Sequence, residues 1–252
     1  MIASRLSASG PEDRRVLMYS TDGGPYGGAQ ILSPAVQDNN TMGNLLLVTL
    51  AGGLQSDADL KSFTIGLTKN LDALCSSGKA ISDETVFAYR KMIDRAATLY
   101  DYVVVDAAGE LDAMTSMVLA KADIVMLCVS QNMKHLTTLN QKKVTTTLPV
   151  LADKNCGVII TRYSPLPYLD TKQVCKMLSC SDVFLLSEDM AIHKNVCQCT
   201  VLDFVSGLYK GIAGKQPKWR KRIEPPVTAK ELDAIVSAIE NLQGPTVDVI
   251  GG

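Results

Sequence analysis

The chain has 252 residues, 46% of them hydrophobic, and its 25 Lys and Arg nearly balance its 26 Asp and Glu. This composition excludes a disordered chain, and seven cysteines are too few for a small disulfide-stapled scaffold. A net charge of -1 also argues against nucleic-acid binding over the whole surface. No apolar run reaches the roughly 18–20 residues that span a bilayer. Residues 1–10 lack the apolar core of a secretory signal, so we expect a cytoplasmic protein with reduced thiols.

Five apolar, β-branched runs predict strands at residues 15–19, 102–106, 124–130, 156–160 and 183–186. Because these runs are continuous rather than alternating, they favour parallel strands that are covered on both faces. Further patterns predict a loop at residues 23–28, a short helix that starts within 38–42, and helices at 82–98, 111–121 and 171–178. Thr228 and Glu231 match a capping box that would start a last helix.

The alternation of strands and helices predicts an α/β fold with a doubly wound, mostly parallel sheet and helices on both faces. We expect a single domain over residues 1–252. Its parts would be a core (1–214), a basic connector (215–227) and a C-terminal helix with a tail (228–252).

Polar residues stand where three of the predicted strands end. Asp106 closes the strand at 102–106, Asp22 follows the first strand, and Thr161 and Arg162 follow the strand at 156–160. Ligands of parallel α/β sheets bind beyond the carboxyl ends of the strands. A hydrophobic run closed by Asp is the Walker B pattern, whose acid holds Mg²⁺ beside a bound triphosphate.

The order and spacing of these pieces, over residues 14–208, resemble the ParA/MinD family of P-loop ATPases and its TadZ/CpaE-like pilus-assembly branch. Residues 99–109 and 120–130 are similar to the family's Walker B strand and the unit that follows it. Residues 156–164 are similar to the strand whose Asn contacts adenine. The resemblance implies that Asp106 holds Mg²⁺, that Asp22 orders the attacking water, and that Thr161 and Arg162 face the base of ATP.

The sequence differs from this family near its N-terminus. Family members begin with a strand and a glycine-rich phosphate-binding loop, but no G-x-x-x-x-G-K-[ST] motif occurs in this chain. Residues 1–10 look like the helix that would follow that loop, so the first strand and the P-loop are expected to be absent. Either the chain starts late or the protein does without them. We therefore expect weak ATP binding at best, and a central slot in the sheet with unpaired backbone groups.

Each site residue also has a structural explanation. Asp106 could cap the next turn, and Asp22 belongs to an Asp-Gly sequence, which is a common turn former. Thr161 and Arg162 could lie in a surface loop, and Thr lacks the paired donor and acceptor of an Asn amide.

Two further groups of residues invite hypotheses. Four cysteines and one histidine suggest zinc, but their spacing matches no common structural zinc site, and buried free thiols explain them better; they are Cys175, Cys180, His193, Cys197 and Cys199. A basic run could bind anionic lipid or nucleic-acid phosphates, or be a solvated connector; its cations are Lys215, Lys218, Arg220, Lys221 and Arg222.

Three functions remain open at this point. The leading one is a degenerate or truncated ParA/MinD-like ATP-binding protein, a homodimeric positioning or assembly factor whose setting by resemblance is a pilus, secretion or conjugation system. ATPase activity is expected of the family but is not shown by these residues. The alternatives are a non-catalytic scaffold on a nucleotide-binding fold, and an adaptor that binds DNA through its basic run.

Overall fold

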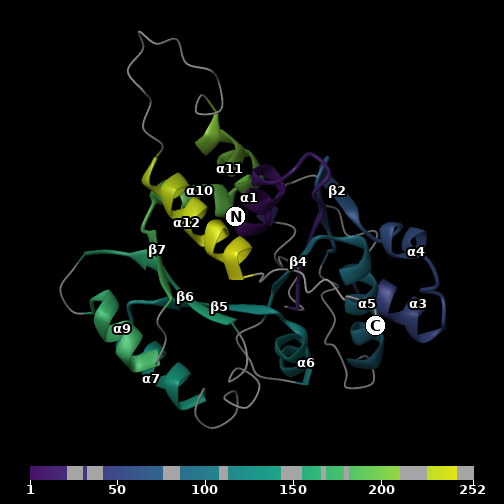
Figure 1. The fold of residues 1–252 in the computed structure, drawn as a ribbon, viewed down its shortest axis with the longest axis horizontal. Coiled ribbons are helices and arrows are strands. Elements are labelled where there is room, and N and C mark those ends of the chain that lie inside the picture. The colour runs from purple at the N-terminus through teal and green to yellow at the C-terminus, as the bar shows by residue number, and fades with distance from the viewer. Residues whose placement is uncertain are drawn as a thin grey trace, which may run out of the picture. The chain divides into compact units, whose positions relative to one another are not determined.

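The computed structural model describes residues 1–21, 31–32, 42–75, 86–107, 113–142, 155–165, 169–178, 182–210 and 226–242 (Figure 1). The chain divides into two compact units, Met1–Val118 with Asp189–Pro225 and Leu119–Glu188 with Pro226–Gly252. The assignment of residues 1–252 to one domain stays a prediction.

The first unit contains a four-stranded sheet in the order β2-β3-β1-β4. Its strands are β1 (Val16–Ser20), β2 (Ile65–Thr68), β3 (Leu71–Ala73) and β4 (Tyr102–Asp106). β1 runs parallel to β3 and β4, whereas β2 is antiparallel to β3. The strands predicted at 15–19 and 102–106 are thus confirmed. The sequence analysis missed β2 and β3, because runs of four and three residues are too short to show a period.

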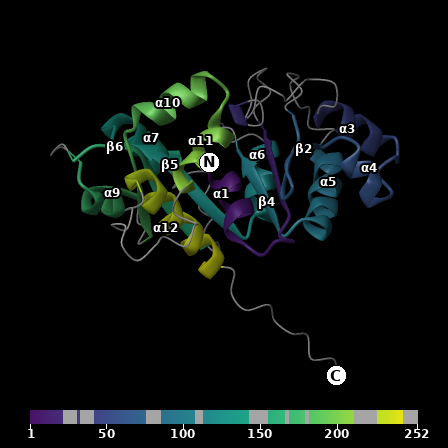
Figure 2. The same cartoon turned by 90° about the horizontal axis from the view of Figure 1, so that it is seen from above.

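Helices cover both faces of this sheet. They are α1 (Ile2–Ser9), α3 (Met42–Leu50), α4 (Asp57–Lys61), α5 (Val86–Leu99), α10 (Met190–Cys197) and α11 (Val201–Tyr209). On one face, Leu17 and Tyr19 of β1 join a core cluster with side chains of α3 and α5. On the other face, Met18 packs against a cluster that contains Val201 and Val205 of α11. Figure 2 shows α3, α4 and α5 gathered on one side of this sheet.

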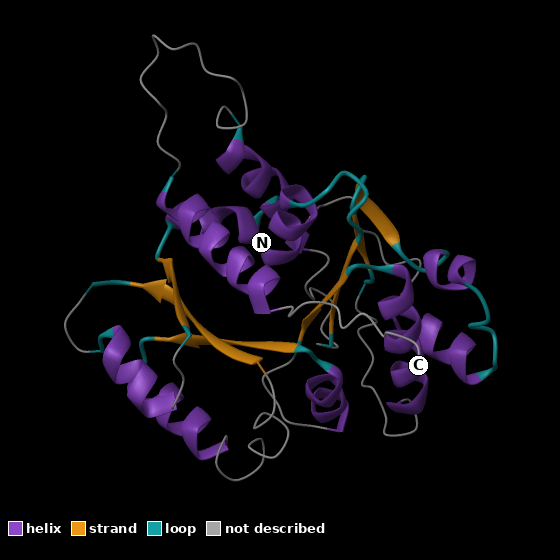
Figure 3. Cartoon of the chain, viewed as in Figure 1, coloured by secondary structure: helices purple, strands orange, loops and turns teal. Residues whose placement is uncertain are grey.

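The second unit contains a three-stranded parallel sheet in the order β5-β6-β7. Its strands are β5 (Ile124–Ser130), β6 (Asn155–Tyr163) and β7 (Val183–Ser187). Helices α7 (Met133–Lys142) and α9 (Thr171–Leu178) cover one face, and α12 (Val227–Leu242) covers the other (Figure 3). The remaining described helix, α6 (Ala113–Lys121), runs from the first unit into the second. The predicted α/β fold, mostly parallel with helices on both faces, is confirmed.

Four further predictions concern a helix start, a loop, a helix cap and membrane spans. The helix expected from residues 38–42 is α3, which begins at Met42, whereas the loop at 23–28 lies outside the described residues. The capping box at Thr228 is wrong, because α12 begins at Val227 and the first helical hydrogen bond runs from Lys230 N to Pro226 O (3.1 Å). No helix in the described ranges is long and apolar enough to cross a membrane.

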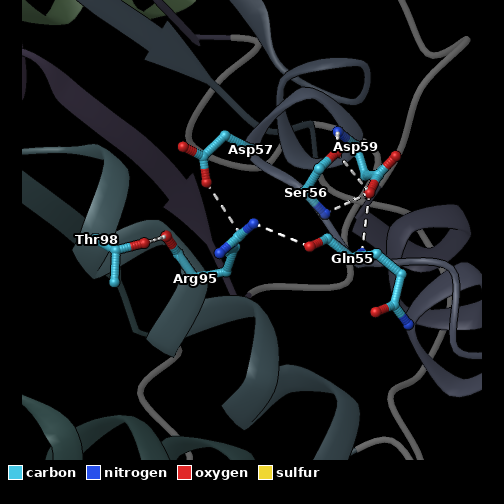
Figure 4. A network of polar contacts seen from close by, with 6 residues as sticks. All are labelled: Gln55, Ser56, Asp57, Asp59, Arg95 and Thr98. Atoms are coloured by element: carbon cyan, nitrogen blue, oxygen red, sulfur yellow. Dashed lines mark hydrogen bonds and ion pairs between the residues drawn. The ribbon is translucent and has the colours of Figure 1, made fainter.

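A capping box does start α4. The side chain of Ser56 accepts a hydrogen bond from Asp59 N (3.3 Å), and a carboxylate oxygen of Asp59 accepts one from Ser56 N (2.6 Å) (Figure 4). Arg95 of α5 ties this turn to the rest of the unit, because its guanidinium forms an ion pair with Asp57 (3.0 Å) and donates to Gln55 O (3.0 Å).

Candidate functional site

Asp106 lies at the carboxyl end of β4, directly beside the end of β1. The two strands are in register at this point, with Ser20 opposite Asp106. The backbone oxygen of Asp106 accepts hydrogen bonds from Thr21 N (2.9 Å) and from the hydroxyl of Ser20 (3.2 Å). These bonds fix the backbone at the strand end, while the Asp106 side chain is exposed to solvent. An accessible carboxylate on a fixed backbone suits a metal ligand.

The amino-terminal end of α1 lies within electrostatic reach of this carboxylate. Burial lowers the pKa of the Met1 amino group to about 6, and the negative charge of Asp106 acts in the opposite direction. Met18 of β1 and Met1 also pack against the same apolar cluster. The first turn of a helix carries partial positive charge, so this end of the sheet combines a carboxylate with a helix start.

Oxygen ligands at this position favour a hard cation. Mg²⁺ is usually held by one or two carboxylates together with waters and substrate phosphates, rather than by an all-protein cage. In the described ranges, no group of three or more His, Cys, Asp or Glu side chains is placed to hold a metal ion. Asp106 is a carboxylate of the type that such a site uses. Asp22, the residue after Thr21, lies outside the described residues, and its role stays a prediction.

Thr161 and Arg162 belong to the second unit, at the end of β6. The Thr161 hydroxyl donates a hydrogen bond to Val129 O of β5 (3.1 Å), so its proton is already engaged within the sheet. Arg162 is exposed and has a φ of 53°, in the left-handed region that non-glycine residues rarely adopt. The pairing of β6 with β7 shifts register at the same point. The strand thus ends in a bulge, a feature that often re-aims side chains near functional sites.

Gln131 organises the loop after β6, and the sequence analysis missed it. Its side-chain oxygen accepts from Ser164 N (2.8 Å), and its side-chain nitrogen donates to Leu169 O (2.8 Å). Its place in the sequence could have identified it, because Gln131 directly follows strand β5, just as Thr21 directly follows strand β1. Both lie at carboxyl strand ends, where ligand sites of parallel sheets form.

The cysteine and histidine group does not form the set of buried thiols that the sequence predicts. Cys197 is exposed, and its sulfur lies 3.8 Å from Nε2 of His193, one turn earlier on α10. Cys175 and Cys199 are half-buried free thiols, and Cys180 lies outside the described residues. The prediction of burial is therefore wrong for Cys197, because α10 has no buried residue at all. The cations between Lys215 and Arg222 also lie outside the described residues.

Comparison with known proteins bears on the fold. No family model matches the chain, and no curated protein matches its sequence. A ParA family ATPase from Chlorobium tepidum TLS is similar in structure, with a TM-score of 0.68, 16% identity, and coverage of 94% of this chain and 92% of that one.

Two solved structures that contain a nucleotide are also similar. The septum site-determining protein MinD complexed with Mg-ADP, from Pyrococcus horikoshii OT3, has a TM-score of 0.66 and 16% identity, over 96% of this chain and 90% of that one. A plasmid partition protein from Borrelia burgdorferi B31 bound to AMPPNP has a TM-score of 0.64 and 16% identity, over 95% and 90%. At these identities the likeness concerns architecture. The chain has the fold of the ParA/MinD ATPases.

Proposed function

We propose that the protein is a nucleotide-responsive positioning or assembly factor of the ParA/MinD type, in which Mg²⁺ and ATP bind at the carboxyl ends of β1 and β4. One observation carries the proposal: the exposed Asp106 side chain on a strand end whose backbone is fixed by Thr21 and Ser20. The similar structures bound to Mg-ADP and AMPPNP support the choice of ligand.

The roles of individual residues follow from this proposal. Asp106 holds Mg²⁺ directly or through water, Asp22 orders the attacking water, and Thr161 and Arg162 face the base. When bound, the magnesium ion neutralises charge on the phosphates. Because the Thr161 hydroxyl donates to Val129 O, it can offer only its lone pairs to the base unless that bond breaks.

The proposal extends to the cellular setting. It is a cytoplasmic homodimer that acts with a protein partner in a pilus, secretion or conjugation system, peripherally at the membrane. The solved MinC:MinD complex from Aquifex aeolicus is an instance of a protein partner on this fold. The cations Lys215, Lys218, Arg220, Lys221 and Arg222 would supply the contact to an anionic surface.

A scaffold without catalysis is the rival function, and the sequence favours it in one respect. The motif G-x-x-x-x-G-K-[ST] does not occur in the chain. The stacked N–H groups and the lysine of such a loop neutralise the β- and γ-phosphates, so binding without them relies on Mg²⁺ and scattered donors.

Titration calorimetry with ATP, with and without Mg²⁺, separates the two functions. We expect weak, Mg²⁺-dependent binding that Asp106→Asn lowers about 10- to 100-fold, the usual effect of altering a metal's protein partners. Asp123→Asn is the matched control, since it removes an exposed carboxylate in the turn before β5. Binding that is absent from all three proteins would favour the scaffold, and equal loss in both variants would contradict the role of Asp106.

A further inference from the structure

Arg162 is an exposed residue whose backbone adopts an uncommon conformation at the end of β6. Its φ of 53° lies in the left-handed region, which residues with a Cβ rarely adopt. Such a conformation persists only where the surrounding structure fixes it, and such positions cluster at ligand sites. The contacts on either side of Arg162 therefore decide how its guanidinium is presented.

Hydrogen bonds anchor the residues directly before and after Arg162. The Thr161 hydroxyl donates to Val129 O of β5 (3.1 Å). On the other side, Tyr163 O accepts from Glu188 N (3.0 Å), just beyond the end of β7. Both neighbours are thus tied to the adjoining strands of the second sheet, and the chain then leaves β6.

Gln131 supplies the next anchor, two residues beyond Arg162. The oxygen of its half-buried side chain accepts a hydrogen bond from Ser164 N (2.8 Å). Pro165 follows and disfavours a helical backbone at Ser164, so the chain around this bond has little freedom. Loss of the bond would release the chain that follows Arg162.

The other end of the same amide is attached to the core of the second unit. The Gln131 side-chain nitrogen donates to Leu169 O (2.8 Å), and Leu169 is buried in a cluster with Val129 and Leu136. Since a carbonyl oxygen cannot donate, this bond assigns the amide nitrogen to Leu169 and the amide oxygen to Ser164 N. A side chain whose own orientation is fixed by a second hydrogen bond is suited to holding another group in position.

We propose that Gln131 is a positioning residue: through Ser164 N it keeps Arg162 in the left-handed conformation and so sets the direction of the guanidinium. For ATP this role rests on the function proposed above, in which Thr161 and Arg162 face the base. Gln131 acts through Arg162 and does not have to touch the nucleotide itself. Its effect is then on the base end of the ligand and not on the phosphates.

A double-mutant cycle tests the link between the two residues without any ligand. Arg162→Gly should raise the urea midpoint of the full chain, because glycine adopts the left-handed region without strain. In the presence of Gln131→Ala the rise should be at most about half as large, since Arg162 can relax once Ser164 is released. A side chain that only ties the loop down would give additive shifts, and additive shifts would overturn the proposal.

Further variants serve as controls for this cycle. Asn155→Ala also removes a side-chain amide from the second sheet, roughly 20 Å from Arg162 along β6, and should be additive with Arg162→Gly. Gln131→Glu keeps an acceptor for Ser164 N and should restore the full rise. If Gln131→Ala does not fold by circular dichroism, Gln131→Met replaces it, because it keeps the length of the side chain and loses both hydrogen bonds. Coupling of Asn155→Ala as strong as that of the Gln131 variant would overturn the proposal.

Titration calorimetry with Mg²⁺ then compares ATP with inorganic triphosphate, which has no base. Gln131→Ala should weaken ATP binding about two- to tenfold, the effect of losing one hydrogen bond, and leave binding of inorganic triphosphate unchanged. Equal loss of both ligands would overturn the action of Gln131 on the base. Non-additive shifts without any binding of ATP to the parent protein would support the role of Gln131 at Arg162 and contradict the nucleotide site proposed above.

Discussion

Among the described residues, the carboxylates of Asp106 and Glu231 both lie at the carboxyl end of a strand, and their surroundings differ. Asp106 ends β4 with an exposed side chain, and its backbone oxygen accepts hydrogen bonds from Thr21 N and the Ser20 hydroxyl at the end of β1. Glu231 of α12 is half-buried, and its two oxygens accept from Ser187 N (2.9 Å) and the Ser187 hydroxyl (2.5 Å) at the end of β7. A carboxylate that accepts two protein hydrogen bonds acts as a structural tie. One that remains accessible on a fixed backbone is available to a ligand.

The largest effect that separates these two roles is on stability. Glu231→Gln should lower the free energy of unfolding by about 1–3 kcal/mol, because an amide cannot accept at both positions and leaves a donor of Ser187 unsatisfied. Urea denaturation measures the loss. Glu188→Gln is the control, since Glu188 is exposed beside Ser187 and should change stability by less than about 0.5 kcal/mol.

A double-mutant cycle with Ser187→Ala identifies the partner. If the carboxylate acts through Ser187, the two substitutions should show a coupling free energy of about 0.5–3 kcal/mol. Simple additivity would mean that Glu231 stabilises α12 by another route.

The role of Glu231 could not be predicted from the sequence. Its spacing from Thr228 matches a capping box, a purely local pattern, but the structure uses its carboxylate on a strand end 44 positions earlier in the chain. Local patterns succeed where the signal itself is local. β4, β5 and α9 are found with the predicted bounds because continuous apolar runs and a capped amphipathic segment need no long-range information.

The strand-end site was only partly predictable for the same reason. The position of Asp106 follows from the strand that it closes, and its register with Ser20 follows from parallel pairing. The engagement of the Thr161 hydroxyl with β5 depends on which strands are neighbours. The left-handed backbone of Arg162 depends on a bulge against β7. Neither the Thr161 hydrogen bond nor the left-handed backbone of Arg162 can be predicted from the neighbouring sequence.

The next largest expected change in stability is at Arg162. Substitutions there measure the backbone strain at the end of β6. A left-handed non-glycine residue costs about 1–2 kcal/mol, so Arg162→Gly should raise the free energy of unfolding by up to about 1 kcal/mol after the extra entropy that glycine loses on folding. Arg162→Ala removes the same side chain but keeps a Cβ, so it should not stabilise the protein. Equal effects in the two variants would show that the side chain, rather than the backbone, sets the stability at this position.

A smaller effect is expected for Asp106 itself. Since its side chain is exposed and Asn is nearly isosteric, Asp106→Asn should change the free energy of unfolding by less than about 0.5 kcal/mol. Urea denaturation in parallel with Glu231→Gln checks this. A loss as large as that of Glu231→Gln would place Asp106 among the structural carboxylates and remove the main support for a metal site.

Asp59 sharpens the comparison, because it has a structural role like that of Glu231 but on the protein surface (Figure 4). Hydrogen bonds from the Ser56 side chain, from the Ser56 backbone and from the Gln55 backbone lower the pKa of Asp59 from its usual value of 3.8. A carboxyl whose pKa is lower in the folded state stabilises the fold above the unfolded pKa, and this contribution is lost as the pH falls through the folded value.

Asp59→Asn should therefore be less stable than the parent protein at pH 7, and the gap should close as the pH falls below 3.8. Urea midpoints at several pH values measure the gap, with Asp123→Asn as the control for removal of an exposed charge. The expected difference is the smallest of the four, because a fully exposed carboxylate exchanges its protein hydrogen bonds for water at little cost. A gap that persists at low pH would mean that the amide of Asn fails to cap α4 for steric reasons. The charge of Asp59 would then have no part in starting that helix.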